Sequence, residues 1–435
     1  MSLPHSIDTS TSRRLVIVVR ADPVICGHSG EARNLAEAAL LRGFDDVRIV
    51  TWPLDALTNL PLKPADRVLP YSPGITVERP EPVGDYKVPD GRYTAGMTGR
   101  LIELFTDGVP TVCLSLYLVP HATAAIEALS VARMMDPRLN VTTIAEAVGS
   151  DITGLVQACV ADGCYGSAAH VFTTYLAHDH PVAVSQYTVD RIIEAATDVD
   201  HALGTTFAAA CRDRIRVSYP AIDTSAFVDL DDAAIAAALE RRGLERDGYA
   251  LFLSRLTPAK GADDLIDGFA QSAAAGSRRL VIAGTGPSAA ELQARADRSG
   301  VGSRITFLDD VDDAEKPLLM AGSGAYVLAS KPRTEFVETF GIALVEKMLA
   351  GGGPVITTAT GGIPEAVGDT AMTIPAGSPL AIAHALDEAL LAIGPEERAA
   401  RADKARTYAM QFDRLQVFDR LVTPDMARGD LLTLS

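Results

Sequence analysis

Glu338 and Glu346 are eight positions apart at the two ends of the segment "ETFGIALVE", which has a Phe-Gly pair inside it. The apolar residues between them are typical of a buried helix that begins near Gly341. The free N–H groups and the positive dipole end of such a helix favour an anion, and a carboxylate on each side can accept hydrogen bonds from sugar hydroxyls. The segment therefore indicates a sugar phosphate site, although a helix cap and a solvated face residue would also explain the two glutamates.

Two further segments contain groups that suit a phosphate ligand. In "SRLTPAKG" (254–261), Arg255 and Lys260 follow a predicted strand and are five positions apart. Two cations at a strand end can neutralise a diphosphate as it leaves, but an exposed basic pair is the alternative interpretation. In "TGGIPEAVG" (360–368), a Gly-Gly turn precedes Glu365 at the start of a helix, which is a second potential backbone cradle for a ligand.

The elements that must position these residues follow a strand–helix alternation. The first unit is the β-branched run "RRLVIVVR" (13–20), then a glycine loop with Gly27, His28 and Gly30, then a helix that ends at Gly43. Similar units recur along the chain. Such alternation is typical of a parallel, doubly wound sheet with helices on both faces.

The length and a change in composition predict more than one domain. At 435 residues the chain exceeds one ordinary domain, and the pattern weakens within 222–248 before a new series begins at "YALFLSRL". We therefore predict an α/β fold of two doubly wound, Rossmann-like domains that face each other across a ligand-binding cleft. The expected limits are 1–222 for the first domain, 223–405 for the second, and 406–435 for a C-terminal helix that packs back towards the first domain.

The stretch 53–95 has no clear period. It is rich in Pro, Gly and charged residues, as in "LPYSPGITVERPEPVGDYKVPDG". Unstructured stretches of this length are usually functional or mobile. The sequence therefore predicts a long surface excursion from the first domain.

The charge balance limits the partners. The chain has 39 Lys and Arg against 56 Asp and Glu, a net charge of −17, which repels phosphate backbones and anionic bilayers. We expect neither nucleic acid nor a membrane surface as a partner. No apolar run approaches the ~18 residues of a spanning helix, and the opening "MSLPHSIDTSTSRR" lacks the apolar region of a signal peptide, so a cytoplasmic location is expected.

An ordered set of motifs in the second half resembles a known family. The segments are "SRLTPAKG", "LVIAGTGP", "RITFLDDV", "ETFGIALVEKMLAGGGPVI" and "TGGIPEAVGD". They are similar to the second domain of the retaining, nucleotide-sugar-dependent glycosyltransferases of family 4, which have the glycosyltransferase-B fold. In the first half the likeness extends through "GHSGEARNLAEAALLRG", "YLVPH" and "RIRVSYPAIDTSAF". The resemblance implies transfer of a sugar from a GDP- or UDP-linked donor to an acceptor, for which the acidic chain favours a small soluble molecule.

The resemblance also implies roles for individual residues. Arg255 and Lys260 would bind the donor diphosphate, Glu346 the ribose, and Glu338 with the adjoining backbone the sugar. The catalytic residues that it implies are His121, Glu338, Arg255 and Lys260. The donor-binding residues are Arg255, Lys260, Gly284, Glu338, Phe340, Gly341, Ile342 and Glu346, and the acceptor-side residues are Gly27, His28 and Gly30.

Two departures from the family pattern concern the sugar site, because Ser254 and Thr339 stand where glycine is common. No D-x-D pair lies at a plausible site, so neither a cofactor nor a metal is expected beyond the nucleotide sugar itself. The acidic run "DDVDD" (309–313) could attract magnesium, but a solvated loop is the favoured interpretation.

Other functions remain open. Gly284, Gly286 and Ala289 form a G-x-G-x-x-A string between a predicted strand and helix, which an NAD-dependent dehydrogenase could also contain. A catalytically silent nucleotide-sugar-binding homologue is a third candidate. A fainter likeness, through "YSPGITVERPEPVGDYKVPDGRYTAGMTGRLIELF", is to antibiotic-pathway members of the family, such as the lincosamide S-glycosyltransferase that joins a GDP-octose to the thiol of ergothioneine. The sugar, the base of the donor, the acceptor and the oligomeric state are left open.

Overall fold

The computed structural model describes residues 12–57, 60, 62–64, 68–84, 89–334 and 336–422. The expectations about the opening segment therefore concern residues that lie mostly outside this part of the chain. The same holds for the end of the predicted C-terminal helix, beyond residue 422.

The first domain contains a sheet of seven strands, ordered β3-β2-β1-β4-β5-β6-β7, and every neighbouring pair is parallel. The strands are β1 (Arg14–Val18), β2 (Asp46–Val50), β3 (Ile75–Glu78), β4 (Thr111–Leu116), β5 (Val141–Ala147), β6 (His180–Ala183) and β7 (Arg216–Val217). β1, β4 and β5 are buried throughout, and most of their residues are apolar or β-branched, as is typical of central parallel strands. The strand order reverses between β1 and β4, which is the switch point where ligands of such sheets bind.

The second domain repeats this plan with six parallel strands in the order β10-β9-β8-β11-β12-β13. They are β8 (Tyr249–Leu253), β9 (Arg279–Ala283), β10 (Ile305–Leu308), β11 (Ala325–Leu328), β12 (Val355–Thr358) and β13 (Met372–Ile374). Here the order reverses between β8 and β11, so a second switch point lies at the carboxyl ends of these two strands.

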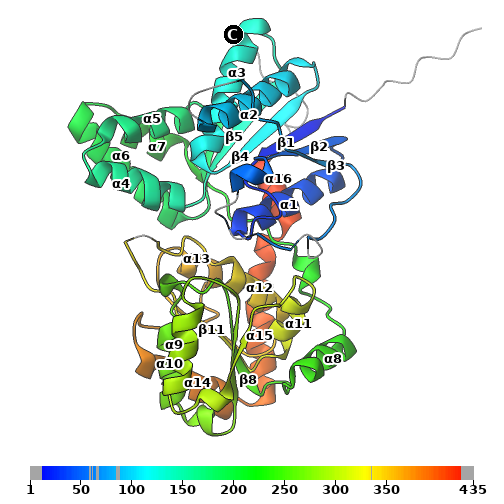
Figure 1. Cartoon of the computed structure of the whole chain (residues 1–435), viewed down its shortest axis with the longest axis vertical. Helices are drawn as coiled ribbons and strands as arrows, with labels where there is room; N and C mark the ends of the chain where they lie inside the picture. Colours follow the sequence, from blue (N-terminus) through cyan, green and yellow to red (C-terminus); the bar gives the residue numbers. More distant parts are fainter. Residues whose placement is uncertain are drawn as a thin grey trace, which may run out of the picture.

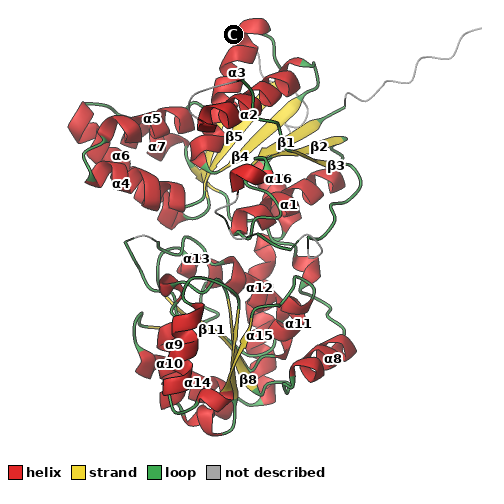
Figure 2. Ribbon diagram, in the orientation of Figure 1, coloured by secondary structure: helices red, strands yellow, loops and turns green. Residues whose placement is uncertain are grey.

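Helices cover both faces of each sheet (Figure 2), which confirms the predicted fold class. Those of the first domain are α1 (Gly27–Leu41), α2 (Pro89–Thr106), α3 (Thr123–Met135), α4 (Gln157–Ala161), α5 (Tyr165–Leu176), α6 (Gln186–Leu203) and α7 (Phe207–Arg214). The later helices are α8 (Asp232–Arg242), α9 (Ala262–Gln271), α10 (Ala289–Arg298), α11 (Glu315–Gly322), α12 (Ile342–Ala350), α13 (Ile363–Val367), α14 (Pro379–Asp387), α15 (Pro395–Ala409) and α16 (Arg414–Leu421). Across the described ranges, none of these helices combines the length and the apolar character that crossing a membrane requires.

The stretch 53–95 is more structured than the sequence predicted. It contains a short 3₁₀ helix (Leu54–Leu57), the edge strand β3 and the start of α2. β3 has only four residues, none of them fully buried, so its alternation of Ile75 and Val77 with polar residues is too short to identify a strand. The prediction of an irregular excursion was therefore wrong at these elements.

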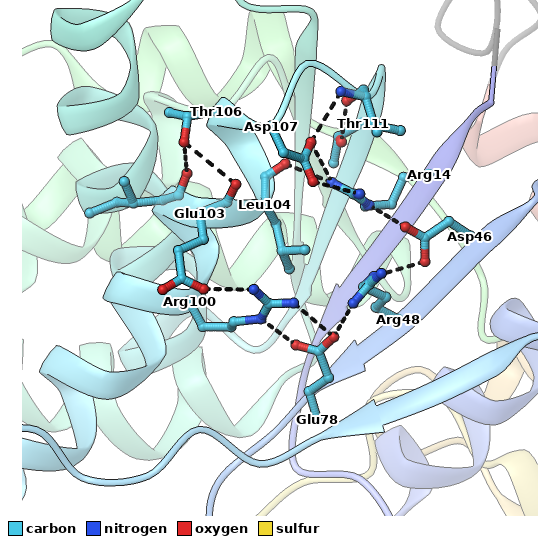
Figure 3. A network of polar contacts seen from close by, with 12 residues as sticks. Arg14, Asp46, Arg48, Glu78, Arg100, Glu103, Leu104, Thr106, Asp107 and Thr111 are labelled. Atoms are coloured by element: carbon cyan, nitrogen blue, oxygen red, sulfur yellow. Dashed lines mark hydrogen bonds and ion pairs between the residues drawn. The ribbon is translucent and has the colours of Figure 1, made fainter.

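A chain of ion pairs fastens this edge of the sheet to α2 (Figure 3). Arg14 and Arg48 both pair with Asp46, at 2.6 and 2.7 Å, and Arg48 also pairs with Glu78 of β3. Glu78 in turn pairs at 2.6 Å with Arg100 of α2. Since Arg14 and Asp46 begin their strands, the network starts at the end of the sheet opposite the switch point, and we assign it a structural role.

The chain crosses between the domains twice, and the two crossings pair with each other. Ile222 forms a parallel bridge with Asp413, in which the Ile222 N–H donates to Phe412 O at 3.0 Å and the Arg414 N–H donates to Ile222 O at 2.8 Å. The returning chain then forms α16, which lies beside α1 (Figure 1). Its apolar residues Val417, Phe418, Leu421 and Val422 belong to the core of the first domain. The domain limits drawn from the sequence remain predictions.

Candidate functional site

The segment 338–346 begins α12 as its spacing predicts. Gly341 precedes the helix with φ 109°, a left-handed conformation that glycine adopts without strain. A side chain there would also meet Leu344, because a Cβ would lie 2.9 Å from its Cδ1. The first N–H groups of α12 therefore follow directly on the loop that carries Glu338, and they provide the anion-binding end of a helix.

Glu338 and Lys260 lie together at this helix start. The Lys260 ammonium donates a hydrogen bond to Oε2 of Glu338, although the two residues are 78 positions apart. Lys260 is 7% exposed, and its Nζ lies 4.9 Å from the centroid of the Phe336 ring. Arg255 is exposed and forms no ion pair with any carboxylate of the described residues. Lys260 and the predicted sugar-binding carboxylate thus meet beyond the carboxyl end of β8, whereas Arg255 does not pair with that carboxylate. The role assigned to each of the three residues stays a prediction.

Glu346 has a partner that the sequence did not reveal. Oε1 of Glu346 lies 2.6 Å from Nζ of Lys316, which is in the first turn of α11. The packing of α11 on α12 brings the two side chains together. A single lysine at a helix start has no distinctive sequence signal, so this pair could not be predicted from the sequence.

The Gly-Gly turn of "TGGIPEAVG" supports the loop that carries Glu338. A Cβ at Gly361 would lie 2.0 Å from Glu338 O, and one at Gly362 would lie 1.9 Å from Thr339 O. The Gly362 N–H donates to Glu338 O at 2.9 Å. The two glycines therefore hold protein backbone rather than forming the separate ligand cradle that the sequence suggested.

The Phe340 side chain packs the same loop against the two segments that cross between the domains. Its side chain is 3% exposed, and the rings of Tyr219 and Phe412 lie 5.5 and 5.1 Å from its ring, between centroids. Because the ring is buried in this cluster, only the backbone of Phe340 is available to a donor. Rotation of the domains about the crossings would act directly on this loop.

Glu365 lies at the domain interface. Its carboxylate accepts the backbone N–H groups of Gln186 at 2.7 Å and of Tyr187 at 2.9 Å, in the first turn of α6. It also accepts the hydroxyl of Tyr219 at 3.3 Å. A second-domain carboxylate therefore caps a first-domain helix, where its charge is favoured by the helix dipole.

Removing this carboxylate should loosen the contact between the domains. We expect Glu365→Ala to lower the free energy of unfolding by about 1–3 kcal/mol, because two charge-assisted hydrogen bonds to a helix end are lost. Urea unfolding followed by circular dichroism measures the change. Asp369→Ala is the matched control, since that exposed carboxylate pairs only with exposed Lys404 among described residues, and equal effects of the two variants would contradict the role of Glu365.

The first turn of α1 faces α12. A Cβ at Gly27 would lie 3.2 Å from Cδ1 of Ile342, whereas one at Gly30 would meet nothing within 4 Å. α1 begins at Gly27, earlier than predicted, because Sγ of Cys26 caps it by accepting the Ser29 N–H at 3.4 Å. Gly27, His28 and Gly30 are thus helical rather than in a loop, and of the two glycines only Gly27 lies close to the donor side.

Thr339, one of the departures from the family pattern, crosses the interface beside this contact. Its hydroxyl donates to Val148 O at 3.1 Å. Gly149 has φ 109°, and a Cβ there would lie 2.1 Å from Cγ2 of Thr339. The loop after β5 and the loop before α12 therefore pack directly on each other.

His121 is buried at the carboxyl end of β4. It is 1% exposed, and Trp52 donates its indole N–H to Nε2 at 2.9 Å, which places the proton of the neutral ring on Nδ1. Nδ1 is buried without a partner among the described residues. Burial lowers the pKa of His121 to about 3, and the charges of Arg20 and His28 act in the same direction. His121 is therefore a neutral hydrogen-bond donor at pH 7.

His28 is neutral for the same reason. Burial lowers its pKa to about 4, and Arg20 and Arg255 lower it further, one cation from each domain. Its Nδ1 is also buried without a partner within the described ranges. The positive charges of two guanidinium groups therefore reach the first turn of α1. This charge would favour a phosphate at this point of the interface.

Arg20 and Tyr117 are site residues that the sequence analysis missed. Arg20 lies two residues beyond the end of β1, and its Cζ lies 5.4 Å from the centroid of the Tyr117 ring. Tyr117 follows β4 with φ 107°, a strained conformation for a tyrosine. Its ring centroid lies 6.4 Å from that of His28 and 6.0 Å from that of His121. The signal in the sequence was a charged residue at the end of the apolar run 13–20, close to the switch point.

The glycines of the G-x-G string have a structural explanation. Gly284 has φ 135° and Gly286 has φ 158°, and a Cβ on them would lie 2.0 Å from Ser254 O and 2.3 Å from Leu256 O. They let the loop after β9 pack against the loop that carries Arg255. The string therefore needs no dinucleotide to account for it, and Gly284 packs against the backbone of Ser254, next to Arg255.

The acidic run 309–313 is not simply a solvated loop. Asp313 pairs at 2.8 Å with Lys63 of the first domain and thereby bridges the interface. Within the ranges that the structure describes, no group of three or more His, Cys, Asp or Glu side chains could hold a metal ion.

The arrangement of the two domains is found in solved structures and identifies the fold. The structure is similar to HepE of Anabaena, solved in complex with UDP and glucose, with a TM-score of 0.65, 17% identity, and coverage of 94% of this chain and 98% of that one. WaaG, a glycosyltransferase involved in lipopolysaccharide biosynthesis, gives a TM-score of 0.62 at 16% identity, with coverage of 97% and 100%. The chain therefore has the glycosyltransferase-B fold that the sequence predicted.

The second domain is similar to a known family. Residues 239–408 match the family described as "Glycosyl transferases group 1". A D-inositol 3-phosphate glycosyltransferase of Mycobacterium sp. (strain JLS) is 33% identical over 206 residues, which are 45% of this chain and 44% of that protein. A GDP-mannose-dependent alpha-(1-6)-phosphatidylinositol monomannoside mannosyltransferase of Mycobacterium tuberculosis (strain ATCC 25618 / H37Rv) is 30% identical over 233 residues, 49% and 59%. The matches span about half the length of these relatives.

Proposed function

We propose that the protein is a retaining glycosyltransferase that moves a sugar from a nucleoside diphosphate sugar to a small soluble acceptor. The observation that carries the proposal is the contact between Lys260 and Glu338 at the start of α12, directly opposite the first turn of α1. A cation, a carboxylate and a helix start at one point suit the phosphate and the hydroxyls of a nucleotide sugar. The match of the second domain to the group 1 family supports the same reaction class.

The cations act on the leaving group. In transfer, the bond between the anomeric carbon and the diphosphate oxygen breaks, and the acceptor heteroatom bonds to the same face of that carbon. The departing phosphate oxygen takes the acceptor proton, so no separate base is needed. Arg255 and Lys260 stabilise the charge that develops on the diphosphate. Lys260 has further N–H groups available for phosphate oxygens while it remains bonded to Glu338.

The remaining site residues orient the donor. Glu338 accepts hydroxyls of the sugar and Glu346 those of the ribose, while the backbone from Phe340 to Ile342 holds the sugar. Neutral His121 donates its Nδ1 proton to a sugar hydroxyl from the first domain. The contacts between the domains exclude water and so limit hydrolysis of the donor.

The acceptor and the base of the donor have to be found by screening. Guanosine and uridine donors both fit the proposal, since the base has no assigned side-chain partner. Candidate acceptors are the polyol phosphate and the glycolipid in the names of the relatives, and small thiols such as ergothioneine with a GDP-octose donor, as in antibiotic metabolism. We place the small soluble acceptors first because of the net charge of −17.

A thermal-shift screen against GDP, UDP, ADP, TDP and NAD tests the proposal. A ligand at 100 times its dissociation constant adds about 2.7 kcal/mol to the free energy of unfolding, so one nucleoside diphosphate should raise the melting temperature clearly. Lys260→Met should abolish the shift, and Lys404→Met, which removes an exposed ion pair, should leave it intact. A shift with NAD alone would favour the dehydrogenase, and nucleotide binding without turnover of any donor would indicate a silent homologue.

A further inference from the structure

Lys316 lies beside the proposed ribose site but has no part in the reaction described above. Its ammonium lies 2.6 Å from Oε1 of Glu346, and the two side chains are 20% and 14% exposed. Nζ also lies 5.2 Å from the centroid of the Phe227 ring. The Phe227 ring therefore restricts the side chain of Lys316. Both side chains are partly exposed, so a ligand can still reach the pair.

The bond from Lys316 leaves half of the Glu346 carboxylate available. An ionised carboxylate has two oxygens and about four acceptor positions. Among the described residues only Lys316 bonds to Glu346, and it uses Oε1, so Oε2 and the remaining lone pair of Oε1 are unused. Vicinal hydroxyls of a ribose need two such acceptor positions in one plane.

Lys316 also restricts the movement of Glu346. A free glutamate side chain samples several rotamers, and fixing one of them costs about 1–2 kcal/mol. α11 holds the lysine and α12 holds the glutamate, so the ion pair fixes the carboxylate relative to both helices (Figure 1). Part of the entropic cost of ordering the Glu346 side chain is therefore incurred on folding, before a nucleotide binds.

We propose that Lys316 is a positioning residue that orients Glu346 to accept the 2′ and 3′ hydroxyls of the donor ribose. The inference rests on the proposed function, because it assigns the nucleotide to this face of the second domain. It gives the protein a specific property: ribonucleoside diphosphates bind more tightly than their 2′-deoxy forms, and this preference depends on Lys316.

A purely structural role for Lys316 makes a different prediction. If the ion pair only held α11 against α12, its loss would lower the free energy of unfolding and weaken all nucleotides equally. The ratio of the two dissociation constants, 2′-deoxy over ribo, would then stay unchanged. This ratio is therefore the quantity to measure, and it is independent of turnover.

The experiment is isothermal titration of the wild-type protein with UDP, GDP and ADP and with the 2′-deoxy form of each. The wild type should prefer one ribonucleotide over its 2′-deoxy form by about tenfold, the size of one hydrogen bond to a charged group. Lys316→Met should bring the ratio close to one, and its affinity should fall more for the ribonucleotide than for the 2′-deoxy form, which keeps only the 3′ hydroxyl. Lys316→Arg should keep most of the preference, and Lys404→Met should keep all of it.

A double variant separates the two roles further. In a Glu346→Ala background, Lys316→Met should have no additional effect on the ratio, because the group that it orients is absent. Lys316→Gln replaces Lys316→Met if the latter fails to fold, and the same ratio is expected. A wild-type ratio in Lys316→Met or in Lys316→Gln, or a wild-type protein without ribose preference, would overturn the inference while leaving the proposed function intact. If no nucleoside diphosphate binds the wild type at all, the proposed function itself fails.

Discussion

Lys260→Met should lower the turnover of the donor by about 10²- to 10³-fold. The variant keeps an apolar stem of similar length but removes the charge that stabilises the departing diphosphate in the proposed mechanism, and single groups of this kind contribute such factors. Release of the nucleoside diphosphate from the donor, with the acceptor found by screening, measures the effect. The melting temperature of each variant shows whether the fold is intact.

Two further variants test whether Lys260 acts on the phosphate or only on Glu338. Removing the lysine leaves a nearly buried carboxylate without its partner, which alone could disturb the site. The double variant Lys260→Met with Glu338→Gln removes that unpaired charge. If its turnover stays as low as that of the single variant, Lys260 binds the diphosphate. Recovery to the level of Glu338→Gln alone would contradict that role, and Lys404→Met should match the wild type.

Glu146→Gln should stabilise the protein increasingly as the pH rises. Glu146, in β5, is fully buried, and neither carboxylate oxygen has a hydrogen-bond partner among the described residues. Burial raises its pKa well above the usual value, and the nearby carboxyls Glu31 and Asp151 add to the effect. The folded state therefore keeps a proton that the unfolded state releases above about pH 4.5. The wild type loses up to about 1.4 kcal/mol of unfolding free energy per pH unit from this group.

Glutamine has no proton to release, so the difference between the variant and the wild type should grow from pH 5 to pH 8. Urea unfolding at each pH measures it. Other buried groups also make the free energy of unfolding depend on pH, and their contribution is common to both proteins. One of them is Glu31, whose pKa burial raises to about 7. Glu127→Gln, at an exposed position of α3, should give a difference that does not depend on pH. A constant difference for Glu146→Gln would show that its carboxyl titrates normally in the folded state.

Periodicity predicted the fold because the signal is local. Strands such as β1 and β8 are continuous buried runs, and a βα series restricts the topology to very few choices. β3 was missed because an edge strand with no buried residue has no such run, and the start of α1 was placed too late because a cysteine side chain caps it. Both errors concern elements that are fixed by contacts rather than by composition.

The candidate site was predicted where ligand-binding residues follow strands in a recognisable order. Arg255, Lys260 and Glu338 could be found in this way, and the structure brings Lys260 and Glu338 together. Lys316 and Arg20 could not, because their positions beside Glu346 and Tyr117 depend on packing between distant segments. The sequence predicted only that Glu365 begins a helix beside a potential ligand cradle. Its carboxylate binds backbone N–H groups of the first domain, a contact that no local sequence pattern reveals.

The return of the chain to the first domain also limits how the protein can be divided into modules. Val417, Phe418, Leu421 and Val422 lie in a hydrophobic core whose other residues precede position 223. An exchange of the first domain between proteins of this fold must therefore transplant two separate segments, the amino-terminal one and the α16 segment. A fusion at the first crossing alone would join the second domain to a first domain that lacks part of its own interior, so chimeras need two junctions, one in each crossing.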